Sequence, residues 1–147
     1  MTEAGTTRTL VIEREMPHSP EKIWRALTEG QLIEEWLLKN DFKPVVGHRF
    51  QFRREPMPNW NGIIDCEVLE VEPTSRLSYG WGSMGLETVV TWILTRVDHG
   101  TRLRLVHSGF VLPRNDTAYR NMSEGWTKVV ERLDLLVGGQ EVPPTRH

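Results

Sequence analysis

The residue of this chain that could carry the widest range of chemistry is His107, within residues 100–110. This stretch reads as the second strand of a hairpin, because it follows an apolar alternating run and a turn that ends in glycine. Side chains two apart on a strand share a face, so the imidazole points the same way as Leu103 and Leu105. An imidazole there can be a hydrogen-bonded core group, a partner for a ligand oxygen or a general base, since its unperturbed pKa lies near neutrality. A catalytic role needs an orienting carboxylate and a second functional group, and no local partner is visible, so the three roles stay open.

Four other positions carry reactive groups but have plainer interpretations. Tyr79 can present its hydroxyl to a ligand, although a buried tyrosine more often bonds to backbone or water. Cys66 can line a pocket as a small apolar group, and no neighbour in the sequence would make its thiol reactive. Glu34 and Glu35 are predicted to be part of a solvated helix face, because adjacent helical side chains point in different directions.

No pattern typical of a metal or cofactor site is present. No two histidines lie at metal-ligand spacing on one predicted element; the five are His18, His48, His99, His107 and His147. The single cysteine excludes a disulfide within the chain and a thiolate zinc cluster. There is no glycine loop of the phosphate-binding type and no serine in a nucleophile elbow. We therefore expect no metal and no cofactor.

Composition and charge narrow the class of protein. The chain has 147 residues, of which 38% are hydrophobic and 26% charged, as in an ordinary single globular domain. The net charge of -2 provides no field for nucleic acid, and Arg53 and Arg54 are predicted to lie on a solvated strand face. No apolar run approaches the roughly 20 residues that span a bilayer, and the polar start lacks the apolar segment of a signal peptide. These features predict a cytoplasmic protein that binds neither nucleic acid nor membrane.

The elements that must position the candidate groups follow from periodicity and capping signals. Residues 7–15 alternate as a first strand, and Ser19 followed by Pro20 marks the start of a short helix. A second short helix comes next, with apolar residues at helical spacing. About five strands follow, and residues 117–137 form an amphipathic helix of about five turns.

This order of elements predicts an α+β fold. A sheet of about six antiparallel strands with one apolar face needs a covering layer, and only the last helix is long enough to supply it. We therefore expect a curved antiparallel sheet wrapped around a long C-terminal helix, with two short helices after the first strand.

Several motifs, in this order along the chain, resemble those of the START-like, helix-grip (SRPBCC) superfamily. They are residues 19–28, 36–37, 68–73, 91–94, 100–110 and 125–126. Within that superfamily the chain is similar to bacterial proteins related to the activator of the Hsp90 ATPase. The resemblance extends over about residues 8–138 and implies one START-like domain over residues 1–147, with a flexible tail at 139–147. It also implies a deep, usually apolar cavity between the sheet and the long helix.

The resemblance further implies that inward-facing residues of the strands and helices line this cavity. The residues expected there are Trp36, Phe50, Phe52, Tyr79, Trp81, Trp92, Leu105, His107, Met122 and Trp126. The alternative is that the same side chains fill a solid core, because aromatic rings serve both purposes. Access is expected through the loops at one end of the sheet, residues 55–62 and 82–86, with the loop around Trp60 as a lid.

Members of the superfamily bind lipids, sterols, polyketides or plant hormones, and some are cyclases. The first hypothesis is therefore binding of a small hydrophobic or amphipathic molecule without catalysis. One alternative is a cyclase- or hydrolase-like enzyme that acts on a hydrophobic substrate. Another is a chaperone- or stress-related interaction module, with a chaperone or a second copy of the chain as the partner.

Overall fold

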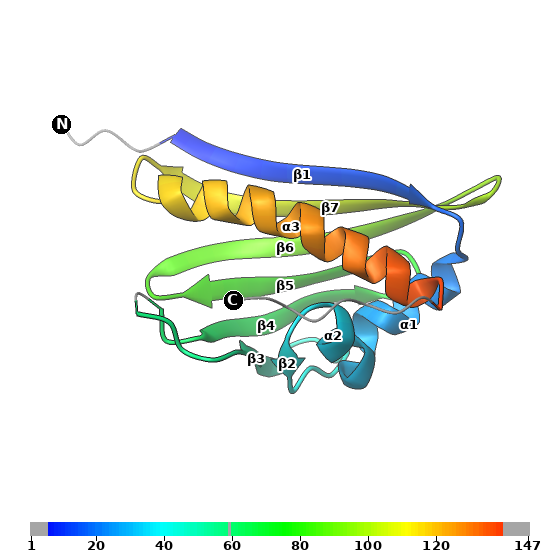
Figure 1. The fold of residues 1–147 in the computed structure, drawn as a ribbon, viewed down its shortest axis with the longest axis horizontal. Coiled ribbons are helices and arrows are strands. Elements are labelled where there is room, and N and C mark those ends of the chain that lie inside the picture. The colour runs from blue at the N-terminus through cyan, green and yellow to red at the C-terminus, as the bar shows by residue number, and fades with distance from the viewer. Residues whose placement is uncertain (1–5, 59, 140–147) are drawn as a thin grey trace.

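The computed structural model describes residues 6–58 and 60–139, which form an antiparallel sheet and three helices. In chain order the elements are β1 (Thr6–Met16), α1 (Pro20–Thr28), α2 (Gly30–Trp36), β2 (Lys39–Asn40), β3 (Arg49–Arg53), β4 (Ile63–Glu72), β5 (Arg76–Ser83), β6 (Leu86–Val97), β7 (Gly100–Leu112) and α3 (Asp116–Val137). Figure 1 shows the strands as a curved layer with α3 lying along its length. Of the predicted flexible tail, residues 140–147 lie outside the described residues.

The strand order is β1-β7-β6-β5-β4-β3-β2, and each neighbouring pair is antiparallel. The predicted α+β fold, with a curved sheet, a long C-terminal helix and two short helices after the first strand, is confirmed. The sheet in the described part of the chain has seven strands instead of about six. The additional strand is β2, which pairs Lys39 with Arg53 and Asn40 with Phe52. Two residues are too few to show the alternation by which a strand is recognised in a sequence.

The two faces of β7 are those that alternation predicted. Leu105 and His107 are buried and lie opposite residues of β1 on the face that meets α3. Arg104 is exposed on the other face, where its guanidinium lies 3.0 Å from the Glu13 carboxylate of β1. Because exposed ion pairs of this kind contribute only about 0–1 kcal/mol, burial of the apolar face decides the register.

The two short helices begin where local chemistry places them. Ser19 caps α1 by accepting a hydrogen bond from the Lys22 backbone N–H at 3.2 Å, and Pro20 occupies the first helical position. The Trp36 indole at the end of α2 donates to the Ala26 carbonyl oxygen at 2.8 Å and ties the two helices together. This bond fixes Trp36 against the concave face of the sheet, where it is 1% exposed.

The C-terminal half of α3 is anchored to the sheet. Val130 and Leu133 are buried, at helical spacing. The Asp134 carboxylate accepts from Arg14 Nε at 2.8 Å and lies 2.7 Å from His18 Nε2. These two contacts join the helix to β1 and to the segment that leads into α1.

The N-terminal half of α3 is less deeply buried. Ala118, Tyr119 and Met122 pack against the core but keep part of their surface exposed. Trp126 marks the transition, since it is 1% exposed. The helix therefore grips the sheet firmly at one end and leaves apolar surface uncovered near the other.

Gly125 offers a way to stabilise α3, and we expect Gly125→Ala to raise the free energy of unfolding by about 0.5–1 kcal/mol. It lies inside the helix, and a Cβ built on it would meet nothing within 4 Å. Alanine restricts the unfolded chain more than glycine does, so the gain comes without a new contact. Urea unfolding followed by circular dichroism measures the change.

The control is Gly109→Ala. Gly109 has φ 103°, and its Cβ would lie 3.3 Å from Thr88 Cα, so this substitution should destabilise the protein. A lower stability of Gly125→Ala would contradict the open space beside Gly125, because it would mean that the added methyl group meets a neighbour.

Candidate functional site

The side chains predicted to line a cavity come together between α3 and the concave face of the sheet. Strands β3, β5, β6 and β7 contribute most of them, and the helices contribute Trp36, Met122 and Trp126. Met122 is partly buried and the others are buried. The set is Trp36, Phe50, Phe52, Tyr79, Trp81, Trp92, Leu105, His107, Met122 and Trp126.

Trp126 of α3 contacts several of these rings at once. Its ring centroid lies 5.2 Å from that of Trp81, 5.6 Å from that of Trp92 and 5.9 Å from that of His107. The edge of Trp36 meets Trp92 with centroids 5.5 Å apart. The rings adopt the tilted and edge-to-face arrangements that aromatic pairs prefer. The middle of the grip is therefore a packed aromatic core, which we call the aromatic core below.

His107 lies within a directed chain of hydrogen bonds. The Trp126 indole N–H donates to His107 Nδ1 at 2.9 Å, and an indole nitrogen can only donate. Thr88 Oγ1 lies 2.7 Å from His107 Nε2 and 2.7 Å from the Trp81 carbonyl oxygen. Since a carbonyl can only accept, the Thr88 hydroxyl donates to it and accepts from His107, which therefore carries its proton on Nε2.

These contacts define the state of the imidazole. His107 is 0% exposed, and burial lowers its pKa from 6.5 to about 3, so the ring is neutral near pH 7. Its Nδ1 lone pair is used on Trp126 and its Nε2 proton on Thr88. His107 thus has the contacts of a hydrogen-bonded core group. Neither nitrogen is free to accept a proton from a substrate.

The other two candidate groups are also buried and neutral. The Trp92 indole N–H donates to the Tyr79 hydroxyl at 2.9 Å, and burial raises the pKa of that phenol. This side-chain partner was not apparent from the sequence. Burial likewise raises the pKa of the Cys66 thiol, so this cysteine lacks the thiolate that a nucleophile needs.

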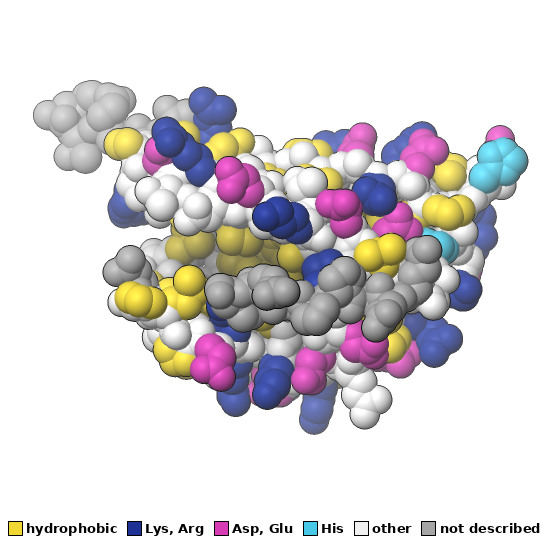
Figure 2. All heavy atoms as spheres, viewed as in Figure 1, with side chains coloured by type: hydrophobic (Ala, Val, Ile, Leu, Met, Phe, Trp, Pro, Cys, Tyr) yellow, Lys and Arg dark blue, Asp and Glu magenta, His cyan; other side chains and the backbone are white. Residues whose placement is uncertain are grey.

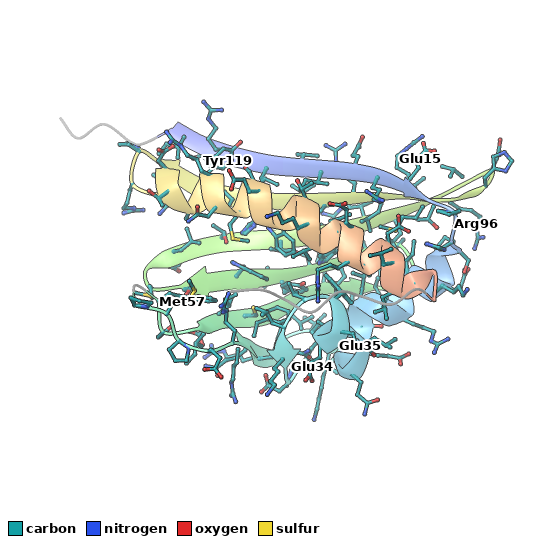
Figure 3. All side chains as sticks on the ribbon, in the orientation of Figure 1. Glu15, Glu34, Glu35, Met57, Arg96 and Tyr119 are labelled. Atoms are coloured by element: carbon teal, nitrogen blue, oxygen red, sulfur yellow. The ribbon has the colours of Figure 1, made fainter. Side chains whose placement is uncertain are left out.

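A hollow with an apolar floor opens beside the aromatic core. Figure 2 shows it directly below α3 in this view. Hydrophobic side chains form its floor over β5 and β6, which Figure 1 labels in the same orientation. Leu86 at the start of β6 and Met122 on α3 are partly buried, as is Trp60 in the loop after β3. Figure 3 labels Met57 in that loop and Tyr119 on the first turns of α3, at the same end of the molecule. The two predicted access loops contact each other at this end through Trp60 and Ser83.

The loop that carries Trp60 is held in place by specific bonds. The Trp60 indole N–H donates to Ser83 Oγ at 2.7 Å, and the Ser83 hydroxyl donates to the Ile63 carbonyl oxygen at 2.8 Å. Gly62 has φ 80°, and a Cβ there would lie 2.3 Å from the Arg54 carbonyl oxygen. Only glycine can therefore close this loop against the end of β3. These contacts fix Trp60 beside Ser83, the last residue of β5.

Arg54 is the residue at this end that the sequence did not reveal. It follows β3 with the same inward phase as Phe50 and Phe52, and its guanidinium carbon lies 5.6 Å from the centre of the Trp60 ring. Its Nε and Nη2 atoms are buried, and neither has a hydrogen-bond partner within residues 6–58 and 60–139. The prediction that both Arg53 and Arg54 are solvated is wrong for Arg54. Side chains two apart on a strand share a face, so Arg54 points inward like Phe52. Extending that alternation by two residues would have found it.

The remaining candidate positions carry no site. Figure 3 shows Glu34 and Glu35 on the outer side of α2, where both are exposed as predicted. In the part of the chain that the structure describes, no group of three His, Cys, Asp or Glu side chains is placed to hold a metal ion. None of the described helices is both long and apolar enough to cross a membrane.

The antiparallel sheet wrapped around α3 defines the helix-grip class of proteins. Within this class, the model of the family described as "Activator of Hsp90 ATPase homolog 1-like protein" matches residues 17–138. This match spans most of the chain, and the protein therefore belongs to that family.

Solved structures of other proteins share this fold. Protein MLL2253 from Mesorhizobium loti is 48% identical, with a TM-score of 0.82 over 90% of this chain and 98% of that one. DynU16, from the dynemicin biosynthetic locus, is 24% identical, with a TM-score of 0.78 over 92% of this chain and 49% of that one. CalU16 from Micromonospora echinospora is 21% identical, with a TM-score of 0.74 over 94% of this chain and 78% of that one. At these lower identities the last two show the fold alone. No functionally curated protein matches the chain significantly.

Proposed function

We propose that this protein binds a small hydrophobic or amphipathic molecule in the hollow between the sheet and α3. The observation that carries the proposal is the apolar floor of that hollow (Figure 2). Trp60, Leu86 and Met122 pack against the core and stay partly exposed, and in this proposal they border the hollow. Apolar side chains that keep such surface beside a well-packed core are typical of ligand sites. A ligand that covers them removes apolar area from water, which contributes roughly 25 cal/mol per Å² before ordering costs.

The aromatic core supplies the rigid back wall of the proposed site. Trp81 and Trp126 contact each other within the aromatic core, and both are nearly fully buried. Because their rings are already held by neighbours, little conformational freedom is lost when a ligand arrives. In this proposal the ten predicted cavity residues act as one preformed wall, and Met122 is the member with surface left to contact a ligand directly.

The proposal is one of binding without catalysis by His107. A general base needs a free lone pair within reach of the proton that it removes, and the Nδ1 lone pair of His107 already accepts from Trp126. Cys66 is buried and lacks thiolate character. These contacts favour a carrier or sensor over a cyclase- or hydrolase-like enzyme.

We place this function in the cytoplasm, where a reducing environment suits the single, buried and unpaired Cys66. The family description suggests a chaperone-related, stress-associated partner as the alternative, and a homodimer is a further one. Those alternatives would use an exposed surface, such as the one around Val45 and Val46, which are 59% and 61% exposed.

The test is a titration with N-phenyl-1-naphthylamine, a neutral apolar dye whose fluorescence rises when it leaves water. We expect saturable binding of one dye per protein, with a Kd of roughly 1–10 μM. Met122→Glu places a charge on the wall of the hollow and should weaken dye binding by about tenfold or more. Fluorescence titration and native mass spectrometry measure affinity and stoichiometry.

The matched control is Val11→Glu, which adds the same charge at a 45% exposed position on β1 and should bind the dye as the unmodified protein does. Absence of saturable binding, or an equal loss in both variants, would argue against the hollow as a ligand site. A complex with a chaperone together with no dye binding would favour the interaction module.

A further inference from the structure

Arg54 differs from the other described arginines whose ion pairs the structure shows. Those arginines face carboxylates on the same helix or on a neighbouring element, with N–O distances of 2.8–3.7 Å; they are Arg14, Arg25, Arg49, Arg76, Arg96, Arg102, Arg104 and Arg120. Arg54 forms no ion pair within residues 6–58 and 60–139, and two of its nitrogens are buried without a hydrogen bond. A buried charged donor without a partner is unfavourable, so its presence in a folded protein calls for an explanation.

The position of Arg54 connects it to the hollow. Its side chain continues the inward face of Phe50 and Phe52, whereas the side chain of Arg53 is exposed and bonds Gln51 on the outer face. The Arg54 guanidinium lies against the ring of Trp60, which Ser83 holds in place. The charge is thus held at a defined point beside Trp60, at the end of the sheet where β3 and β5 stop.

The identity of the two unpartnered atoms indicates what they bind. The N–H groups on Nε and Nη2 lie side by side along one edge of the planar guanidinium, and they match the two oxygens of a carboxylate. A single hydroxyl or ketone could use only one of them. A carboxylate would satisfy both and neutralise the buried charge at once.

We propose that Arg54 binds the carboxylate of the ligand, so that the class of ligand is an amphipathic carboxylic acid. This inference rests on the function proposed above and makes it more specific. The acid group sits against Arg54 and Trp60, and the hydrophobic body lies along the floor towards Leu86 and Met122. The aromatic core behind the floor excludes water from the pair and so strengthens it.

The experiment uses displacement of N-phenyl-1-naphthylamine from the full chain by decanoate and, in parallel, by 1-decanol. The two competitors have the same alkyl chain and differ in the carboxylate. We expect Arg54→Met to reduce the preference for decanoate over decanol by about tenfold or more, because one bidentate charge-assisted contact is lost. The preference is a ratio of two competitors measured with the same dye, so any change that Arg54→Met causes in dye affinity cancels. Arg53→Met, which removes a neighbouring exposed arginine, should leave the preference unchanged.

A second readout separates ligand binding from a structural role. In the absence of ligand, the buried donors of Arg54 are unsatisfied, so the urea midpoint of Arg54→Met should equal or exceed that of the unmodified protein. A clearly lower midpoint would show that Arg54 stabilises the fold and would overturn the assignment.

The other outcomes are equally distinguishable. If the dye binds and decanol displaces it, but Arg54→Met leaves the preference for decanoate unchanged, the carboxylate assignment fails while the proposed function stands. The assignment also fails if Arg53→Met changes that preference as much as Arg54→Met. If the unmodified protein binds neither dye nor competitor, the proposed function fails and the carboxylate assignment with it.

Discussion

Lowering the pH from about 7.5 to about 4.5 is expected to reduce the free energy of unfolding by about 3 kcal/mol through His107 alone. Burial lowers the pKa of this imidazole from 6.5 to about 3 in the folded protein. Between these values the unfolded chain binds a proton that the folded protein does not, so stability falls as the pH falls, by about 1.4 kcal/mol per pH unit. The contribution is fully present above pH 6.5, and the loss is complete below about pH 3, where both states are protonated.

The contacts of His107 explain why protonation is so unfavourable. A proton on Nδ1 would turn that atom into a donor facing the indole N–H of Trp126, which also donates. The ring neighbours are Trp81, Phe110 and Trp126, none of which can compensate a charge by ion pairing. Protonation therefore breaks a bond and leaves a buried cation.

Urea unfolding between pH 4.5 and 7.5, repeated on His107→Gln, isolates this term. Glutamine can accept from Trp126 and donate to Thr88, but it does not titrate, so the variant should lose the slope that His107 produces. Carboxylates that titrate in the same range affect both proteins and cancel in the difference. Identical pH profiles for the two proteins would contradict the neutral, buried state of His107.

Replacing Trp126 by alanine is expected to cost at least about 4 kcal/mol of unfolding free energy. Two effects combine in this variant. Removing a fully buried indole leaves a cavity between Trp81 and Trp92, and truncations of this size typically cost about 3–5 kcal/mol. In addition, His107 Nδ1 loses its donor and becomes a buried, unsatisfied acceptor.

The matched control is Trp60→Ala, since Trp60 is only partly buried and its indole bonds Ser83. We expect its cost to be no more than about half that of Trp126→Ala, because less apolar surface is lost. Urea unfolding measures both, and Trp126→Phe gives a graded value if the alanine variant does not fold. Equal costs for the two tryptophans would mean that Trp126 does not hold the grip together.

The parts of the fold that were predictable are those with a local cause. Ser19 and Pro20 mark the start of α1 because capping and a fixed φ act within one turn of the chain. The spacing of buried residues along α3 reflects the helical period, and the faces of β7 reflect the strand period. Strand β2 was missed because two residues carry no period.

The candidate site was predictable only as a set of faces. Alternation indicated that His107 points inward, and it left three roles open: a hydrogen-bonded core group, a ligand partner and a general base. The choice depends on Trp126 and Thr88, each 19 residues away in the sequence and on different elements. Arg54 differs from His107, because no motif in the sequence singled it out. Its neighbour Arg53 is exposed, and both arginines were predicted to be solvated.

The sequence by itself determined the order of the main elements and their apolar faces, because periodicity and caps are properties of neighbouring residues. Its motifs, such as residues 100–110, indicated the family by resemblance. Only the tertiary structure decided which side chains meet, because α3 is brought across the sheet from the far end of the chain. That packing satisfies both nitrogens of His107 and fills the middle of the grip with rings. It leaves two donors of Arg54 without partners among the residues that the structure describes. Whether a buried group has a hydrogen-bond partner depends on three-dimensional contacts. These contacts make His107 a satisfied core group and Arg54 the candidate for binding a ligand.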